Sequence, residues 1–209
     1  MNPDRGNRML DIACGKGRHS KALADMGFDV TGIDLSFESI RDALEFQEEN
    51  LHFFQHDMRL PFWINYFDYA FNFFTSFGYF KTKREHNNAI RTIAQALKLH
   101  GTFTMDYLNV HYAEDHLEKV SSKKVEDVKF FITKWQDEDH FFKQIQAEDK
   151  GTVKHLSTEK VAKFTLGDFT EMFAYHGLQI QEVFGDYHFA DYDIRKSPRL
   201  IMIAKKIKA

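Results

Sequence analysis

Two glycines that follow a short apolar run constrain this chain more than any other feature. The run Met9–Ile12 precedes Gly15 and Gly17, and the next apolar run ends at Asp34. Glycine lets the backbone turn sharply after a strand and approach a ligand without interference from a Cβ atom. An acid about 20 residues further on is where a βαβ unit presents a carboxylate to a ribose diol. The pattern predicts a strand, a glycine turn, a helix and a second strand that bind a nucleoside-containing cofactor.

The residues around the glycines distinguish between nucleoside cofactors. A dinucleotide fingerprint has the form G-x-G-x-x-G, and here Ser20 stands in place of the third glycine. Asp11 lies four residues before Gly15, where a carboxylate would repel a pyrophosphate. The same charge suits the ammonium and sulfonium groups of S-adenosylmethionine. We therefore expect S-adenosylmethionine as the cofactor. An NAD(P)-dependent oxidoreductase, which would share the βαβ unit, is the less favoured alternative.

Three segments together resemble the successive cofactor motifs of the class I S-adenosylmethionine-dependent methyltransferases. They are Asp11–Gly17, Val30–Ser36 and His56–Met58, and the resemblance extends over most of the chain. It implies that the first segment holds the methionine end, that the acid of the second binds the ribose hydroxyls, and that the third borders the adenine. Ala13 stands where the family more often has glycine. The cofactor residues implied are Asp11, Ala13, Cys14, Gly15, Gly17, Asp34, Leu35, Asp57, Met58 and Asn72.

Each of these signals also has a purely structural explanation. An acid after a strand is often a helix N-cap, a role open to Asp34 and to Ser36. Asp57 stands two residues before Arg59 and could form a surface ion pair of little energy. Cys14, the single cysteine, is best explained as a small buried residue at a strand end rather than a nucleophile. The joint order and spacing of the signals favour the cofactor site.

Strands and helices alternate along most of the chain, which is typical of a doubly wound α/β sheet. The run at 67–73 is almost continuously apolar, as expected of a strand buried on both faces of a parallel sheet. Capping boxes at Thr82/Glu85 and Thr165/Asp168 predict helix starts, and Gly101 is predicted to end the first of these helices. Strands are expected at about 9–12, 28–33, 51–55, 67–73, 102–108, 178–184 and 200–205, with helices at about 17–26, 37–44, 82–101 and 165–176.

Between residues 121 and 164 apolar and polar residues alternate instead. This pattern predicts an antiparallel β meander inserted after strand five of a seven-stranded, Rossmann-like sheet. We expect one methyltransferase domain over residues 1–209 that carries this insertion. The alternating stretches are Val125–Trp135, His140–Ala147 and Thr152–Phe164, separated by turn signals at Asp137–Asp139 and Asp149–Gly151.

The topology also predicts where a methyl acceptor binds. In open α/β sheets ligands bind beyond the carboxyl ends of the strands. The meander leaves that edge after the fifth strand, and the loop Gly185–Pro198 leaves it too if the sixth strand is parallel. Ordinary core packing explains the aromatic residues there about equally well. The candidate pocket residues are Thr75, Phe77, Tyr79, Asn109, His111, Tyr112 and Tyr187, with Phe80, His188 and Tyr192 beside them.

No residue is singled out as a catalytic base. An in-line methyl transfer depends mainly on alignment and desolvation, and it needs a base only if the acceptor must lose a proton. His111 and Tyr112 are suitably placed, although a lone histidine is more often structural. Phe73 and Phe74 follow Asn72, in place of the Pro-Pro-Tyr of methyltransferases that act on nucleobases or glutamine, which disfavours a DNA or release-factor substrate. The 11 histidines show no spacing typical of metal ligands, so no metal is expected.

Composition excludes several classes of partner. The 209 residues, 43% of them apolar, suffice for one well-packed domain. A net charge of -3 gives no basic surplus for binding long nucleic acids. A single cysteine and the lack of a run of about 18 apolar residues predict a cytoplasmic protein without a membrane partner. Family members usually have helices before the first strand that close over the cofactor, so we expect either a truncated form or an unusually open site.

The sequence therefore predicts an enzyme that transfers a methyl group from S-adenosylmethionine to an oxygen or nitrogen atom of a small molecule. The main alternative is a protein that binds S-adenosylmethionine without transferring its methyl group. The meander has a competing structural explanation as well. Its apolar alternation at Phe130, Ile132, Phe141 and Ile145 would also suit a cover for the sheet or the contact of a homodimer.

Overall fold

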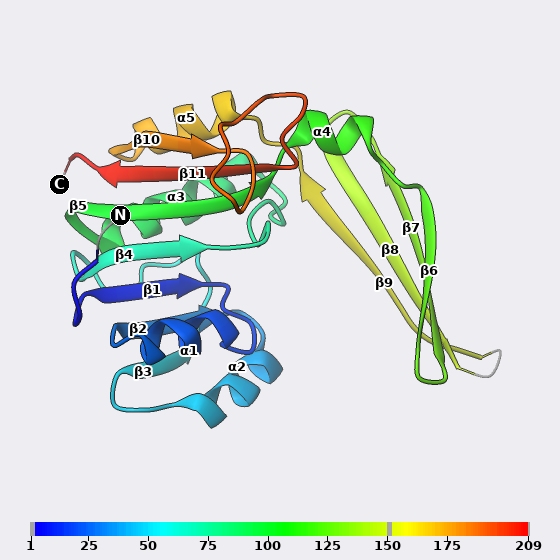
Figure 1. Ribbon diagram of the computed structural model, residues 1–209, viewed down its shortest axis with the longest axis horizontal. Coiled ribbons are helices and arrows are strands. Elements are labelled where there is room, and N and C mark those ends of the chain that lie inside the picture. The colour runs from blue at the N-terminus through cyan, green and yellow to red at the C-terminus, as the bar shows by residue number, and fades with distance from the viewer. Residues whose placement is uncertain (1–2, 150–151, 209) are drawn as a thin grey trace.

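Residues 3–149 and 152–208 are described by the computed structural model, and Figure 1 shows that they form two sheets. The first sheet contains β1 Arg8–Ile12, β2 Asp29–Asp34, β3 Leu51–Gln55, β4 Phe67–Asn72, β5 Leu97–Leu108, β10 Leu178–Phe184 and β11 Arg199–Lys206. The second contains β6 Val120–Val125, β7 Val128–Gln136, β8 His140–Asp149 and β9 Thr152–Ala162. The helices are α1 Arg18–Asp25, α2 Phe37–Ala43, α3 Lys83–Ala96, α4 Val110–Asp115 and α5 Leu166–Tyr175, and a 3₁₀ turn follows α2 at Leu44–Phe46.

The strand order confirms the predicted fold class. The seven strands lie in the order β10-β11-β5-β4-β1-β2-β3, and the five strands from β5 to β3 are parallel. β11 is antiparallel to β5, and β10 is antiparallel to β11, so β10 runs parallel to the central strands. The fold is a Rossmann-like doubly wound sheet with an antiparallel insertion after the fifth strand. The loop 185–198 therefore starts at the same carboxyl edge as the glycine turn.

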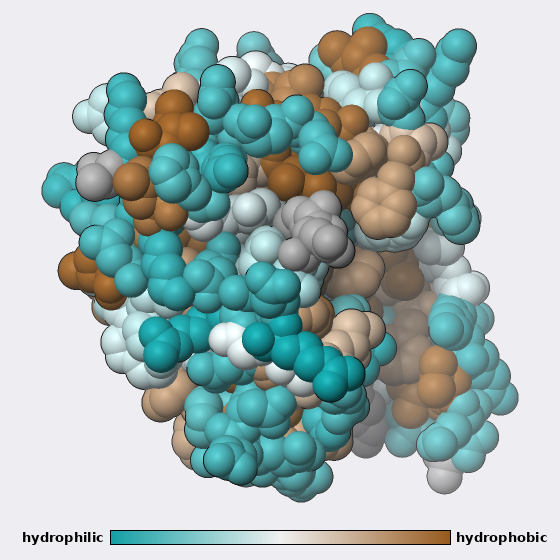
Figure 2. Space-filling model, turned by 60° about the vertical axis from the view of Figure 1, so that its left-hand side comes forward, coloured by the Kyte–Doolittle hydropathy of each residue, from teal (hydrophilic) through white to brown (hydrophobic). Residues whose placement is uncertain are grey.

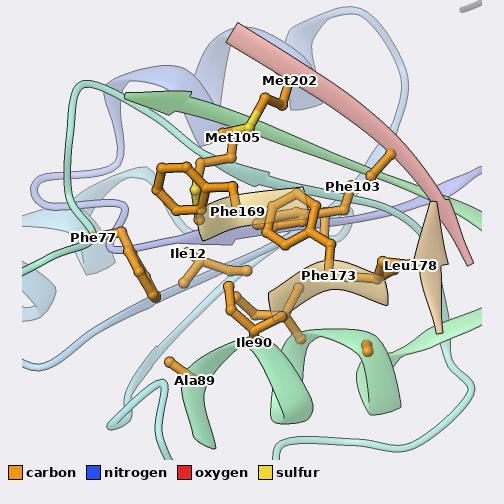
Figure 3. Close-up of a cluster of buried hydrophobic side chains, with 14 of the residues drawn as sticks. Ile12, Phe77, Ala89, Ile90, Phe103, Met105, Phe169, Phe173, Leu178 and Met202 are labelled. Atoms are coloured by element: carbon orange, nitrogen blue, oxygen red, sulfur yellow. The ribbon is translucent and has the colours of Figure 1, made fainter. Parts of the chain in front are cut away.

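Helices cover both faces of this sheet, and each face has its own core. Successive residues of β1 point to opposite faces, so Met9 joins the core under α1 and α2, whereas Leu10 and Ile12 join the core under α3 and α5. Figure 3 shows the second of these cores, in which Ile90 of α3 and Phe173 of α5 lie against the sheet. Burial on both faces explains why the central strands are continuously apolar.

Both predicted capping boxes are confirmed. The Thr82 hydroxyl accepts a hydrogen bond from the Glu85 amide at 3.2 Å, and the Glu85 carboxylate accepts from the Thr82 amide at 3.0 Å. Thr165 and Asp168 make the same pair of contacts at the start of α5, at 3.3 and 2.8 Å. Each box satisfies amides that have no partner inside the helix.

The prediction that Gly101 ends α3 is wrong. The helix ends at Ala96, and β5 begins at Leu97, so Gly101 lies inside the strand. The pairing of β5 with β4 shifts register after Leu97, and His100 has a φ of 67° within the irregularity. A Cβ atom at Gly101 would lie 2.9 Å from the Lys98 carbonyl oxygen. This glycine therefore permits a bulge rather than a helix end.

Two other boundaries differ from expectation. The insertion has four strands rather than three, because Val120–Val125 pairs with β7 although its sequence is rich in serine and lysine. In the predicted stripe of α2, Phe37 is 61% exposed and Leu44 lies in the 3₁₀ turn, which leaves Ile40 and Ala43 as its buried residues.

Residues 150–151 of the second predicted turn lie outside the described residues. None of the helices in the described part of the chain is long and apolar enough to cross a membrane.

Candidate active site

A cleft of about 760 Å³ lies at the carboxyl end of β1, beside α1. It brings together four of the predicted cofactor residues and the side chains that follow β4. We call the seven-stranded sheet with its helices the body, and the four-stranded sheet β6–β9 the projecting sheet. Figure 2 shows apolar residues in the recess between the two. The cleft is lined by Asp11, Ala13, Cys14, Gly15, Lys16, Arg18, His19, Asp42, Glu45, Phe46, Phe73, Phe74 and Ser76.

The two glycines of the turn have different functions. Both have left-handed φ angles, 56° at Gly15 and 77° at Gly17, as does Ala13 at 60°. A Cβ atom at Gly17, the N-cap of α1, would lie 2.6 Å from the Phe53 ring. A Cβ atom at Gly15 would meet none of the described atoms within 4 Å, although this residue borders the cleft. Gly17 is therefore required for packing, whereas Gly15 leaves open space where a ligand can approach the backbone.

Asp34 presents a carboxylate beside Gly15. One of its oxygens accepts the Gly15 amide at 2.9 Å and the other accepts the Ser36 amide at 2.8 Å. The helix cap is supplied by Ser36, whose hydroxyl accepts the Ser39 amide at 3.2 Å. No ion pair involves Asp34 among the residues that the structure describes. The side chain of Leu35 is 64% exposed next to it, as an apolar surface for a ring would be. The placement fits a ribose with an adjoining base.

Asp11 lies in the cleft wall but is 2% exposed. Its carboxyl group accepts a hydrogen bond from the Ser20 hydroxyl at 2.6 Å, which ties β1 to α1. Burial raises the pKa of the Asp11 carboxyl above its ordinary value, and the Ser20 contact opposes this only in part. Burial likewise raises the pKa of the Cys14 thiol, which makes it a poor nucleophile.

The other predicted cofactor residues lie outside the cleft lining. The Asp57 carboxylate is held by the Arg59 guanidinium, with an Nε contact of 3.0 Å and an Nη2 contact of 2.6 Å. This pair lowers the pKa of Asp57. Met58 packs against the core, and the buried Asn72 donates to the Ile12 carbonyl at 3.1 Å. The ion-pair explanation of Asp57 is thus what the structure shows, and contact with adenine stays a prediction.

A second pocket of about 370 Å³ lies between α4, the turn after β4 and the projecting sheet. Three of the predicted acceptor residues, Thr75, Tyr79 and Tyr112, line it. The insertion lines one side of this pocket, in line with the expectation from its position after the fifth strand, but sequence reasoning named none of the insertion residues that do so. The pocket is lined by Thr75, Tyr79, Leu108, Tyr112, Ala113, His116, Leu117, Glu118, Lys134, Phe141, Phe142, Lys143, Glu159, Val161 and Pro198.

Four other candidates do not line this pocket. Phe77 is fully buried in the core, as Figure 3 shows, so it is a packing residue. Asn109 is 1% exposed and holds the loop 185–198, because its amide donates to the Ser197 carbonyl at 2.8 Å. His111 faces Glu114 at 3.9 Å. Tyr187 donates to the Asp106 carboxylate at 3.0 Å.

One turn separates the cleft from the second pocket. Phe73, Phe74 and Ser76 line the cleft, whereas Thr75 between them lines the pocket. Sequence reasoning also missed His19, whose ring centroid lies 5.1 Å from that of Phe74 in the cleft. The two hollows therefore share this single stretch of backbone.

Comparison with known proteins finds methyltransferases. Residues 9–101 match the model of a family described as a methyltransferase domain. The chain is 27% identical to YqeM of Bacillus subtilis (strain 168), a protein provisionally named a methyltransferase. That alignment covers 99% of this chain and 86% of the relative.

Solved structures share the fold. An S-adenosylmethionine-dependent methyltransferase from Clostridium acetobutylicum ATCC 824 superposes with a TM-score of 0.83 at 17% identity, covering 95% of this chain and 83% of that one. The S-adenosylmethionine-bound CalS10, an amino pentose methyltransferase from Micromonospora echinaspora, gives 0.72 at 19%, covering 96% and 84%. The chain therefore has the fold of these S-adenosylmethionine-dependent methyltransferases, and its residues 9–101 match a methyltransferase domain.

Proposed function

We propose that the enzyme methylates an oxygen or nitrogen atom of a small molecule that binds in the second pocket. The observation that carries this proposal is the shared turn, which lines the cofactor cleft with Phe74 and Ser76 and the pocket with Thr75. A pocket of about 370 Å³ suits a small molecule. Its walls are mainly apolar and aromatic, with charged groups such as Lys143 and Glu159 at 3.3 Å from each other.

The cleft residues fit the cofactor in two respects. The space at Gly15 admits a ligand to the backbone, and the Asp34 carboxylate is held by amides rather than by a cation among the described residues. We assign the methionine end to the Ala13–Gly15 turn and the ribose hydroxyls to Asp34. When bound, S-adenosylmethionine supplies an activated methyl group on a positively charged sulfur atom.

The residues of the chain have three tasks in this reaction. The turn at 73–76 aligns the two hollows, because methyl transfer is an in-line displacement. The rings of Phe73 and Phe74 give the cleft side of that turn an apolar surface. His19 is an imidazole within the cleft, and it is our candidate to accept a proton if the acceptor atom must lose one.

The neighbouring structures support a small acceptor by analogy, since CalS10 is named as an amino pentose methyltransferase. Amino groups and hydroxyl groups of metabolites are therefore the first acceptors to test. A cytoplasmic setting belongs to the same proposal. It is supported by the sequence, whose one cysteine cannot form an intrachain disulfide.

The test is turnover with a pool of metabolites. The enzyme is incubated with S-adenosylmethionine and fractionated metabolites, and products are read by mass spectrometry for the gain of one methyl group. We expect S-adenosylhomocysteine to form together with one methylated product. Tyr79→Ala should then lower kcat/KM for that acceptor by about tenfold or more, while the exposed Tyr175, changed to Ala, serves as the control. Turnover that requires a protein fraction instead of small metabolites would contradict the proposal.

A further inference from the structure

The Asp106 carboxylate, at the end of β5, joins three segments that are far apart in the sequence. It is 2% exposed. One of its oxygens accepts the Arg199 guanidinium at 2.7 Å, and the other accepts the Phe74 amide at 2.9 Å and the Tyr187 hydroxyl at 3.0 Å. Arg199 also donates from Nη2 to the Thr75 hydroxyl at 3.0 Å. The carboxylate therefore links the turn after β4, the start of β11 and the loop 185–198.

The turn that Asp106 holds has a strained backbone. Phe74 and Thr75 have φ angles of 55° and 60°, in the left-handed region that L-residues disfavour. A β-branched residue is especially unsuited to this region. Two adjacent residues of this kind persist only if their surroundings hold them. Both of the turn's amides bond to Asp106, since the Thr75 amide donates to the Asp106 carbonyl at 2.9 Å.

This strained turn is also the stretch of backbone shared by the two hollows. Phe74 lines the cofactor cleft, where its ring lies beside His19. Thr75 lines the acceptor pocket, and Arg199 holds its hydroxyl. A small movement of the turn would therefore change the alignment of both ligands at once. Alignment of the two ligands sets the rate of a displacement reaction. The conformation of this turn therefore bears on the rate of methyl transfer, whereas strain in a remote loop would not.

We propose that Asp106 and Arg199 are positioning residues for methyl transfer: they hold the Phe74–Thr75 turn in its left-handed conformation. Their role is to set the rate of transfer rather than the affinity for S-adenosylmethionine. Tyr187 adds a third contact, through which the loop 185–198 supports the same turn. The rate argument rests on the proposed function, whereas the conformation of the turn can be measured without any acceptor.

The experiment compares two identical substitutions. Arg199→Lys keeps a positive charge at Asp106 but loses the planar fork that contacts Asp106 and Thr75 together. Arg195→Lys is the matched control, because Arg195 lies in the neighbouring loop and pairs with Asp115 at 3.2 Å on the exposed surface. Amide hydrogen exchange at Phe74 and Thr75 is the first measurement, and calorimetric binding of S-adenosylmethionine is the second.

We expect Arg199→Lys to speed exchange at Phe74 and Thr75 by about tenfold or more, with exchange in the central strand β1 unchanged. Affinity for S-adenosylmethionine should stay within about threefold. Once an acceptor is known, kcat should fall by about tenfold or more. The control should change none of these quantities by more than about twofold. Tyr187→Phe, which removes one hydrogen bond and keeps the ring, should give a smaller change in the same direction.

Two results would overturn the proposal. One is unchanged exchange at Phe74 and Thr75 in Arg199→Lys. The other is a loss of S-adenosylmethionine affinity in that variant that equals its loss of rate. If Arg199→Lys does not fold, Tyr187→Phe decides by the same measurements. Failure to find any small-molecule acceptor would count against the proposed function, and the exchange result would still decide whether this network holds the turn.

Discussion

The seven-stranded body and the four-stranded sheet differ in how they are stabilised. Helices cover both faces of the body, and Met9, Leu10 and Ile12 of its central strand are at most 2% exposed. In the projecting sheet, Phe130 and Ile132 are only half-buried. The sheet is joined to the body mainly at its root, where Ala162 donates its amide to the Gly78 carbonyl and accepts the Tyr107 hydroxyl. We therefore expect the body to hold the cofactor by itself, whereas the proposed acceptor pocket is lined by both parts.

Removal of the projecting sheet tests this difference most severely. β6 and β9 lie at opposite edges of the sheet, three strand spacings or about 14 Å apart. A linker of about five Gly and Ser residues from Lys119 to Lys160 spans that distance and keeps Val161 and Ala162. We expect S-adenosylmethionine affinity within about tenfold, roughly 1.4 kcal/mol, and complete loss of methyl transfer. Calorimetry and product analysis by mass spectrometry measure the two effects.

The same variant tests whether the sheet forms a dimer contact. Sedimentation of the parent and the variant gives the oligomeric state of each. If a dimeric parent becomes a monomer that keeps its activity, the sheet is an interface and not an acceptor wall. A folded monomer with full activity from a monomeric parent would remove both roles.

Gly15 and Gly17 separate ligand binding from folding within one turn. Gly15→Val should keep the fold at a cost in stability, because a β-branched residue is strained at a φ of 56°. It should weaken S-adenosylmethionine binding by about a hundredfold or more, since the side chain enters the cleft. Gly17→Val should strongly destabilise the fold, because its Cβ atom would lie 2.6 Å from the Phe53 ring and its φ of 77° disfavours a β-branched residue. Circular dichroism and calorimetry distinguish the two outcomes. Normal cofactor binding by folded Gly15→Val would place the ligand elsewhere.

Asp34→Ala should weaken S-adenosylmethionine binding by roughly 1.5–3 kcal/mol, because it removes a charged acceptor for the ribose hydroxyls. It also releases the Gly15 and Ser36 amides, so Asp34→Asn is the milder companion. Asp25→Ala, on the exposed end of α1, is the control. Calorimetry with unchanged affinity in folded Asp34→Ala would exclude Asp34 from the site.

The smallest expected effect concerns the pH dependence of the body. His86 of α3 is buried among aromatic rings, its Nδ1 bonds the Thr82 carbonyl, and burial lowers its pKa below 6.5. The unfolded chain therefore binds a proton that the folded chain does not, and the free energy of unfolding falls as the pH drops below 6.5. The slope is at most about 1.4 kcal/mol per pH unit for this group.

His86→Phe keeps a ring in place and should reduce the fall in the free energy of unfolding at acid pH. Urea unfolding between about pH 7.5 and 5.5 measures this change. Burial lowers the pKa of His176 as well, so part of the fall in the free energy of unfolding at acid pH should remain. Removal of the projecting sheet should leave this pH dependence of the free energy of unfolding nearly unchanged, although His140 of β8 lowers the pKa of His86 slightly. If His86→Phe does not change the loss of stability at acid pH, that loss comes from other titrating groups.

Local patterns predicted the elements well where neighbours in sequence are also neighbours in space. The Thr82/Glu85 box places its donors and acceptors within one helical turn, so its sequence suffices. Gly101 was misread because a glycine signals a helix end and a strand bulge alike, and only the register of β4 decides between them. Phe77 was misplaced for a similar reason, since an aromatic residue after a strand suits a pocket wall and a core equally.

By itself, the sequence determined the alternation of strands and helices, the glycine turn and the acid that follows it, because these depend on short-range periodicity and backbone freedom. Tertiary structure alone decided that Asp11 is 2% exposed at the site, where its carboxyl group accepts the Ser20 hydroxyl. It also made Asp106 the partner of Arg199, 93 residues away. Such contacts arise from the packing of distant segments, which no local pattern records.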